Sequence, residues 1–89
     1  MAKEVVLFAS EERHSLKSVA AFLRDLADRL DTNEVILRKG AEELVVPIPD
    51  NVVLELKVEE EKKKQRTQRS LEIEIEWYEG EEQGSLTLG

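Results

Sequence analysis

Residues 71–78 read LEIEIEWY and residues 52–60 read VVLELKVEE, and these two segments decide the fold. In each of them apolar side chains alternate with charged ones, and this period of two is typical of a half-buried strand. The basic stretch 61–69 separates the two segments. The pattern predicts a long antiparallel hairpin with one apolar face and one largely acidic face.

The segment upstream of this hairpin contains a helical pattern. Between residues 16 and 30 the apolar residues are spaced three and four apart, which predicts a one-sided amphipathic helix of about four turns. Ser15 precedes the first apolar residue and is a good N-cap. Asn33 follows the last one and can take the left-handed conformation that ends a helix.

Three shorter strands complete the expected sheet. Residues 34–38 and 42–46 flank a turn in which Gly40 supplies a positive φ. Residues 4–10, EVVLFAS, have apolar side chains at both parities and are expected to form a covered strand. We therefore predict an α+β fold: one antiparallel-rich sheet of about five strands with a single amphipathic helix packed on one face, in the order β-α-β-β-β-β.

The length of 89 residues accommodates one domain, which we expect over residues 1–79, followed by a flexible C-terminal tail over residues 80–89. The expected core combines the helix stripe with one face of each strand. It consists of Val5, Leu7, Leu16, Val19, Leu23, Leu26, Leu30, Ile36, Val45, Leu54, Leu56, Val58, Ile73 and Ile75.

Composition narrows the classes of function. Twenty acidic and 13 basic side chains give a net charge of −7, which disfavours a general binder of nucleic acids or anionic membranes. The absence of cysteine excludes disulfides, thiolate metal sites and thiol catalysis, and it suits a reducing cytoplasm. The apolar run 5–9 is too short for a signal-peptide core, and no stretch approaches the ~20 apolar residues of a membrane span. We therefore expect a cytoplasmic protein that does not bind membranes.

The strand of alternating glutamate and aliphatic residues that ends in Trp77 resembles the signature of the prokaryotic amphi-Trp domain. Other pieces resemble that family in the same order: EVVLFASEERHS, SVAAFLRDLADRL, VILRKG and VVLELKVEEE. The likeness covers about residues 3–79. It implies a small bacterial or archaeal domain with this fold, and it supplies neither an activity nor catalytic residues.

The inventory of reactive side chains is small. His14 is the single histidine, and it is either a general base or metal ligand or an exposed loop residue; a second histidine or a cysteine to share a metal with it is lacking. None of the serines has a recognisable histidine partner in the sequence. The outward glutamates of the last two strands form either a solvated face or a weak Ca²⁺ site. These are Glu55, Glu59, Glu72, Glu74 and Glu76. We expect no catalytic residues, no cofactor and no metal.

Two features are candidate binding sites. The loop 62–69 concentrates five of the 13 positive charges, and it either contacts phosphates or an acidic partner or is a solvated turn that discourages aggregation. Trp77 either closes one end of the core or, beside Tyr78, anchors a partner. The candidate partner-binding residues are Lys62, Lys63, Lys64, Arg66, Arg69, Trp77 and Tyr78.

We expect a non-enzymatic interaction module that binds an unknown protein partner or itself as a homodimer. The alternative is weak binding of nucleic acid or of a phosphate-bearing ligand through the loop 62–69, which the net charge disfavours and does not exclude.

Overall fold

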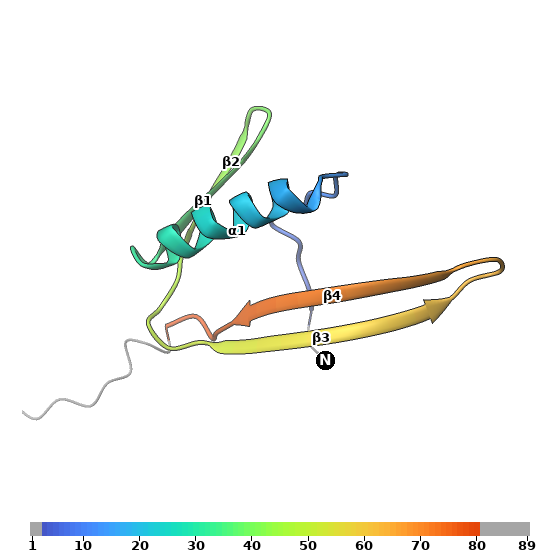
Figure 1. Cartoon of the computed structure of the whole chain (residues 1–89). Helices are drawn as coiled ribbons and strands as arrows, with labels where there is room; N and C mark the ends of the chain where they lie inside the picture. Colours follow the sequence, from blue (N-terminus) through green and yellow to red (C-terminus); the bar gives the residue numbers. More distant parts are fainter. Residues whose placement is uncertain (1–2, 81–89) are drawn as a thin grey trace, which may run out of the picture. The chain divides into compact units, whose positions relative to one another are not determined.

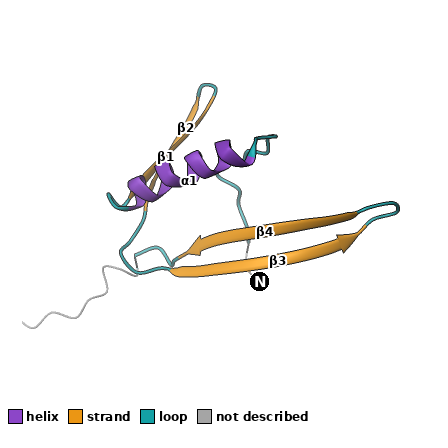
Figure 2. Cartoon of the chain, viewed as in Figure 1, coloured by secondary structure: helices purple, strands orange, loops and turns teal. Residues whose placement is uncertain are grey.

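The computed structural model describes residues 3–80 and contains one helix and four strands (Figures 1 and 2). The chain divides into two compact units, residues 1–48 and residues 49–89. The elements are α1 (Leu16–Leu30), β1 (Glu34–Lys39), β2 (Glu42–Pro47), β3 (Val53–Lys62) and β4 (Thr67–Glu76).

This architecture confirms the α+β class and corrects the predicted sheet. In the described residues the strands form two separate two-stranded antiparallel sheets, β1–β2 and β3–β4, in place of one sheet of about five strands. The predicted tail falls outside the described residues except for Gly80, and the limits predicted for the domain remain a prediction.

Helix α1 has the bounds that the apolar spacing predicts. The extended Ser15 precedes it, and the Oγ atom of Ser15 accepts a hydrogen bond from the backbone N–H of Ser18 at 3.0 Å. A cap of this kind stabilises a helix by about 1 kcal/mol. Beyond the helix, Asn33 adopts the predicted left-handed conformation with a φ of 60°.

The first hairpin buries the face opposite to the one expected. Val35 is 7% exposed and is the one buried apolar residue among residues 3–80, and Leu37 on the same face is half-buried. Helix α1 contacts β1 and lies beside it in Figure 1. The predicted core residues Ile36 and Val45 pair with each other on the other, exposed face. The buried face carries four apolar side chains, Val35, Leu37, Leu44 and Val46, whereas Ile36 and Val45 alternate with Glu34, Arg38 and Glu43, so the alternation itself favoured the face that is buried and the prediction chose the wrong one.

Residues 4–10 are not a strand, which corrects the first predicted element. They run as irregular backbone, and Val5, Val6 and Leu7 are exposed. A segment that is apolar at both parities needs neighbouring strands and cover on both faces. Within residues 3–80 no strand pairs with residues 4–10, so their local preference for extended structure does not produce a strand.

The second hairpin has the predicted alternation. Strands β3 and β4 pair over their whole length, from Val53 opposite Glu76 to Lys62 opposite Thr67. Because β4 begins at Thr67 and ends at Glu76, Trp77 and Tyr78 lie just beyond it. The apolar cross-strand pairs are Leu54 with Ile75, Leu56 with Ile73, and Val58 with Leu71.

Several expected core positions are exposed in the described structure. Every residue of β3 is exposed, with Leu56 at 63% and Val58 at 74%. In the other unit Leu16, at the first position of α1, is exposed as well, whereas Leu26 and Leu30 are half-buried. The alternation in β3 and β4 therefore gives the hairpin one apolar face. No other element of the unit that contains the hairpin packs on this face in the described residues.

Candidate interaction surface

The apolar face of the β3–β4 hairpin is the first candidate surface. Its central pair is Leu56 with Ile73, and both side chains are more than half exposed. Monomeric soluble proteins rarely expose contiguous apolar patches larger than a few hundred Å². A two-stranded hairpin is also only marginally stable unless further strands or a helix pack with it. The face therefore has the properties of a contact surface.

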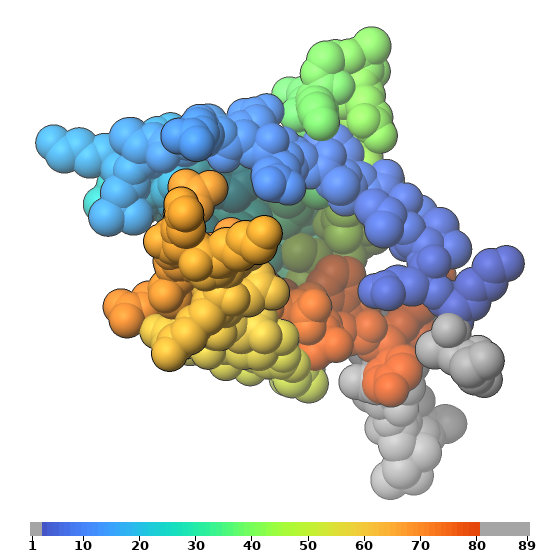
Figure 3. Space-filling model, turned by 90° about the vertical axis from the view of Figure 1, so that its right-hand side faces the viewer, coloured from blue at the N-terminus to red at the C-terminus, as the bar shows by residue number. Residues whose placement is uncertain are grey.

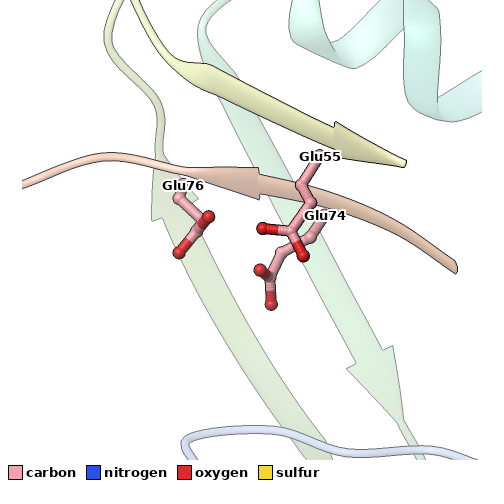
Figure 4. Close-up of side chains that lie close together, drawn as sticks. All are labelled: Glu55, Glu74 and Glu76. Carbon is pink, nitrogen blue, oxygen red and sulfur yellow. The ribbon is translucent and has the colours of Figure 1, made fainter. Parts of the chain in front are cut away.

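The opposite face of the same hairpin is acidic. Carboxylate oxygens of Glu55, Glu74 and Glu76 lie within 4.8 Å of one another, and their side chains project from the two neighbouring strands (Figure 4). The charge of Glu76 is the main cause that raises the pKa of the Glu74 carboxyl above its ordinary value. The cluster joins three of the five glutamates predicted to share this face.

The other two glutamates of that face lie beside Lys57. The Nζ atom of Lys57 is 3.4 Å from a carboxylate oxygen of Glu72 and 3.7 Å from one of Glu59. The hydrogen bond to Glu72 is the main cause that raises the pKa of Lys57. Lys57 therefore offsets part of the negative charge on this face.

This charge pattern fits a solvated face better than a cation site. Ca²⁺ takes six to eight oxygen ligands, usually from a loop that wraps the ion. Here the cluster consists of three exposed carboxylates on two extended strands, and no loop of residues 3–80 wraps around them.

Removal of the Glu74 charge is expected to stabilise the protein at neutral pH. The pKa of the Glu74 carboxyl is raised in the folded protein. The folded protein therefore binds a proton at Glu74 more tightly than the unfolded chain does, and the contribution of Glu74 to stability increases as the pH falls toward 4.5. Glu74→Gln should raise the melting temperature at pH 7 and reduce the gain that the wild type shows between pH 7 and about pH 5. Glu79→Gln, outside the cluster, is the control. Equal pH profiles for wild type and Glu74→Gln would contradict the account.

The tip of the hairpin is shorter than the predicted loop 62–69, because Lys62 is the last residue of β3 and Arg69 lies within β4, opposite Glu60. Residues 63–66 turn between the strands, and the backbone N–H of Lys63 donates to the carbonyl oxygen of Arg66 at 2.8 Å. Figure 3 views the hairpin from this end, where the yellow and orange side chains project toward the reader. The structure therefore brings the predicted basic residues together at one exposed end.

Two of the five basic side chains of the tip are engaged by carboxylates. The Nζ atom of Lys63 lies 3.6 Å from Glu61, and the Nε atom of Arg69 lies 3.0 Å from Glu60. Within residues 3–80, the other three have no ion pair. These are Lys62, Lys64 and Arg66.

The predicted aromatic anchors lie at the opposite end of the hairpin. Trp77 is half-buried and Tyr78 is 79% exposed, and together with Val52 they line a hollow at the open end. A ten-residue strand separates this hollow from the tip, which is roughly 30 Å at ~3.3 Å per residue. The tip and the aromatic pair are therefore two separate features.

A polar network at the start of α1 was not foreseen. The His14 imidazole accepts or donates through Nδ1 to the Ser18 hydroxyl at 3.2 Å, and its Nε2 atom is 2.9 Å from a Glu12 carboxylate oxygen. This corrects the expectation that no serine has a histidine partner. The signal was the spacing of four residues between His14 and Ser18 across the helix start.

This network lacks the surroundings of a hydrolytic site. The His14 and Glu12 side chains are 48% and 55% exposed. Activation of a serine by histidine depends on oriented donors in a site that excludes water. We interpret the network as a set of polar contacts that order the entry to the helix.

Comparison with known families gives one finding. The family model described as the Amphi-Trp domain matches residues 1–89. The comparisons with curated proteins and with solved structures found no match. Among the described residues, no helix has the length and apolar character needed to cross a membrane.

Proposed function

The chain belongs to the Amphi-Trp domain family, and on that premise we propose that it is a non-enzymatic interaction module whose contact surface is the β3–β4 hairpin. The observation that carries the proposal is the uncovered apolar face centred on Leu56 and Ile73. Burial of an aliphatic side chain stabilises an assembly by about 1.5–3 kcal/mol relative to full exposure. Each apolar side chain that a partner covers on this face therefore stabilises the complex by part of that amount.

The distribution of titratable groups also supports a non-enzymatic role. A catalytic acid and base usually occupy a cleft where their environments separate their pKa values. In residues 3–80 the two groups with resolved pKa shifts, Lys57 and Glu74, both lie on the solvated acidic face. The lack of cysteine is compatible with work in the cytoplasm.

The experiment that tests this function is co-purification from the native host. Tagged full-length chain is compared with Leu56→Ser on the apolar face and with Glu59→Ser on the acidic face of the same strand. Circular dichroism first establishes that all three proteins are folded. A protein retained by the wild type and by Glu59→Ser, and lost with Leu56→Ser, supports the proposal. Equal recovery on all three proteins contradicts it.

A second candidate function follows from the tip, because three of its cations have no ion pair among the described residues. Each neutralised phosphate contributes about −0.9 to the slope of log affinity against log salt on B-DNA. Three cations therefore give a slope no steeper than about −3. The acidic face of the same hairpin opposes the approach of a polyanion.

Binding of oligonucleotides is accordingly expected to be weaker than micromolar at about 150 mM salt, where the Debye length is ~8 Å. Titrations with labelled single-stranded and duplex oligonucleotides compare the wild type with a variant in which Lys62, Lys64 and Arg66 are replaced by Ser. Sub-micromolar affinity that disappears in this variant would place nucleic-acid binding ahead of the interaction module.

A further inference from the structure

We propose that the partner of the hairpin is a second copy of the same chain, added along the outer edge of β3 so that two hairpins form one four-stranded antiparallel sheet. This inference rests on the proposed function, since it names a partner of the same hairpin; that partner pairs with the backbone edge of β3, and the apolar face of the joined sheet stays available for contact.

The outer edge of β3 is suited to pairing with another strand. In the described residues β3 pairs on one side only, with β4, so its other edge presents backbone donors and acceptors along Val53–Lys62. This segment contains neither proline nor glycine, the residues that commonly interrupt such an edge. Two copies would supply four strands with one continuous apolar face, whereas an isolated hairpin has too few strands for independent stability.

The side chains of β3 are self-complementary about Leu56. A two-fold axis at this residue sets Leu56 opposite Leu56 of the second copy and sets Leu54 opposite Val58. On the other face the same register sets Lys57 opposite Glu55, and symmetry produces this oppositely charged pair twice. Next to the axis apolar side chains thus meet apolar ones and opposite charges meet; farther out Val53 lies opposite Glu59.

Other pairings lack this match. An axis at Ile73 on the outer edge of β4 also aligns apolar residues, but it sets Glu72 opposite Glu74 of the second copy twice, and directly opposed like charges are destabilising. An axis at Val58 on β3 sets Glu55 opposite Glu61 and Leu56 opposite Glu60. The charge pattern therefore selects the β3 edge and the register centred on Leu56.

The test separates contacts within a chain from contacts between copies. Within the hairpin Glu55 is opposite Glu74, so Glu55→Lys improves the intrachain pair while it sets lysine against Lys57 of the second copy. The wild type should have twice the mass of one chain by sedimentation and light scattering. Glu55→Lys should weaken self-association about tenfold or more without lowering the melting temperature of the monomer. The double variant Glu55→Lys/Lys57→Glu should restore the dimer.

The matched control is Glu74→Lys. It creates the same kind of lysine–glutamate pair inside the hairpin, but on β4, away from the proposed axis, and it should leave the dimer intact. Loss of the dimer in Glu74→Lys, or an unchanged dimer in Glu55→Lys, would overturn the register.

Cross-linking tests the axis directly, because the chain has no cysteine of its own. Residues directly opposite in antiparallel strands have Cα atoms about 4.5–5.5 Å apart, which a disulfide can span. Leu56→Cys should form a disulfide-linked dimer under mild oxidation. Ile73→Cys should not, because the two copies of Ile73 lie three strand spacings apart, about 14 Å. Efficient linking through Ile73→Cys would overturn the proposal.

The outcomes also separate this inference from the proposed function. A wild type that is monomeric at every concentration overturns the inference. If that monomer still captures a different protein in a manner that depends on Leu56, the interaction module stands without the homodimer. If it captures nothing, both proposals fail.

Discussion

Leu56→Lys is expected to destabilise the protein by about 3 kcal/mol or more, since it places a charge at the centre of the apolar face. In the single chain Leu56 is 63% exposed, and a lysine there would remain solvated at little cost. In an assembly that covers this face, the same lysine would be buried without a partner. The loss in free energy of unfolding therefore shows whether a partner covers the apolar face in the native assembly.

Chemical denaturation measures this difference, with Glu74→Lys as the control. That control introduces the same side chain into the same hairpin, on the acidic face, where it meets Glu55. We expect the stability of Glu74→Lys to equal or exceed that of the wild type. A loss below about 0.5 kcal/mol for Leu56→Lys, typical of an ordinary surface site, would contradict the account.

Asn33→Val is expected to cost about 2–4 kcal/mol, the largest effect predicted in the first unit. Asn33 closes the open end of the β1–β2 hairpin: its Nδ2 atom donates to the carbonyl oxygen of Ile48 at 2.9 Å, and its own carbonyl oxygen accepts the N–H of Ile48 at 2.9 Å. Valine removes the side-chain donor and strains a backbone with a φ of 60°, a region that β-branched residues avoid.

Asn33→Gly separates the two contributions. Glycine adopts positive φ without steric strain, so this variant loses mainly the side-chain hydrogen bond, about 1 kcal/mol. Denaturant unfolding of the three proteins gives both values. Equal losses for the valine and glycine variants would show that backbone conformation at this position contributes nothing.

The elements predicted correctly are those whose signal is local. The three-and-four spacing with the Ser15 cap gave both ends of α1, and the period of two gave the hairpin of β3 and β4 with its apolar and acidic faces. The elements predicted wrongly depend on which segments pack together. Residues 4–10 have strand-forming side chains but pair with no strand within residues 3–80. Ile36 was chosen for the core although the Val35 face of its hairpin carries more apolar side chains.

The candidate site divides in the same way. The basic tip and the acidic face follow from the order of charges along two strands, so their residues were predictable. The hydrogen bonds that join Glu12, His14 and Ser18 were missed, because they depend on how an irregular segment approaches the first turn of α1. Residue type along the strands was therefore enough to identify the apolar and acidic surfaces, whereas contacts made by irregular segments were not predictable.

Amide hydrogen exchange at high and low protein concentration is the most direct test of the claim that the hairpin is a contact surface for a second copy. In an isolated hairpin, the amides on the outer edge of residues 53–59, the stretch of β3 that pairs with itself in the register centred on Leu56, face water and exchange rapidly. We predict that these amides are protected at high concentration and lose their protection on dilution, while those of α1 change little. Rapid exchange along this edge at every concentration would contradict this prediction.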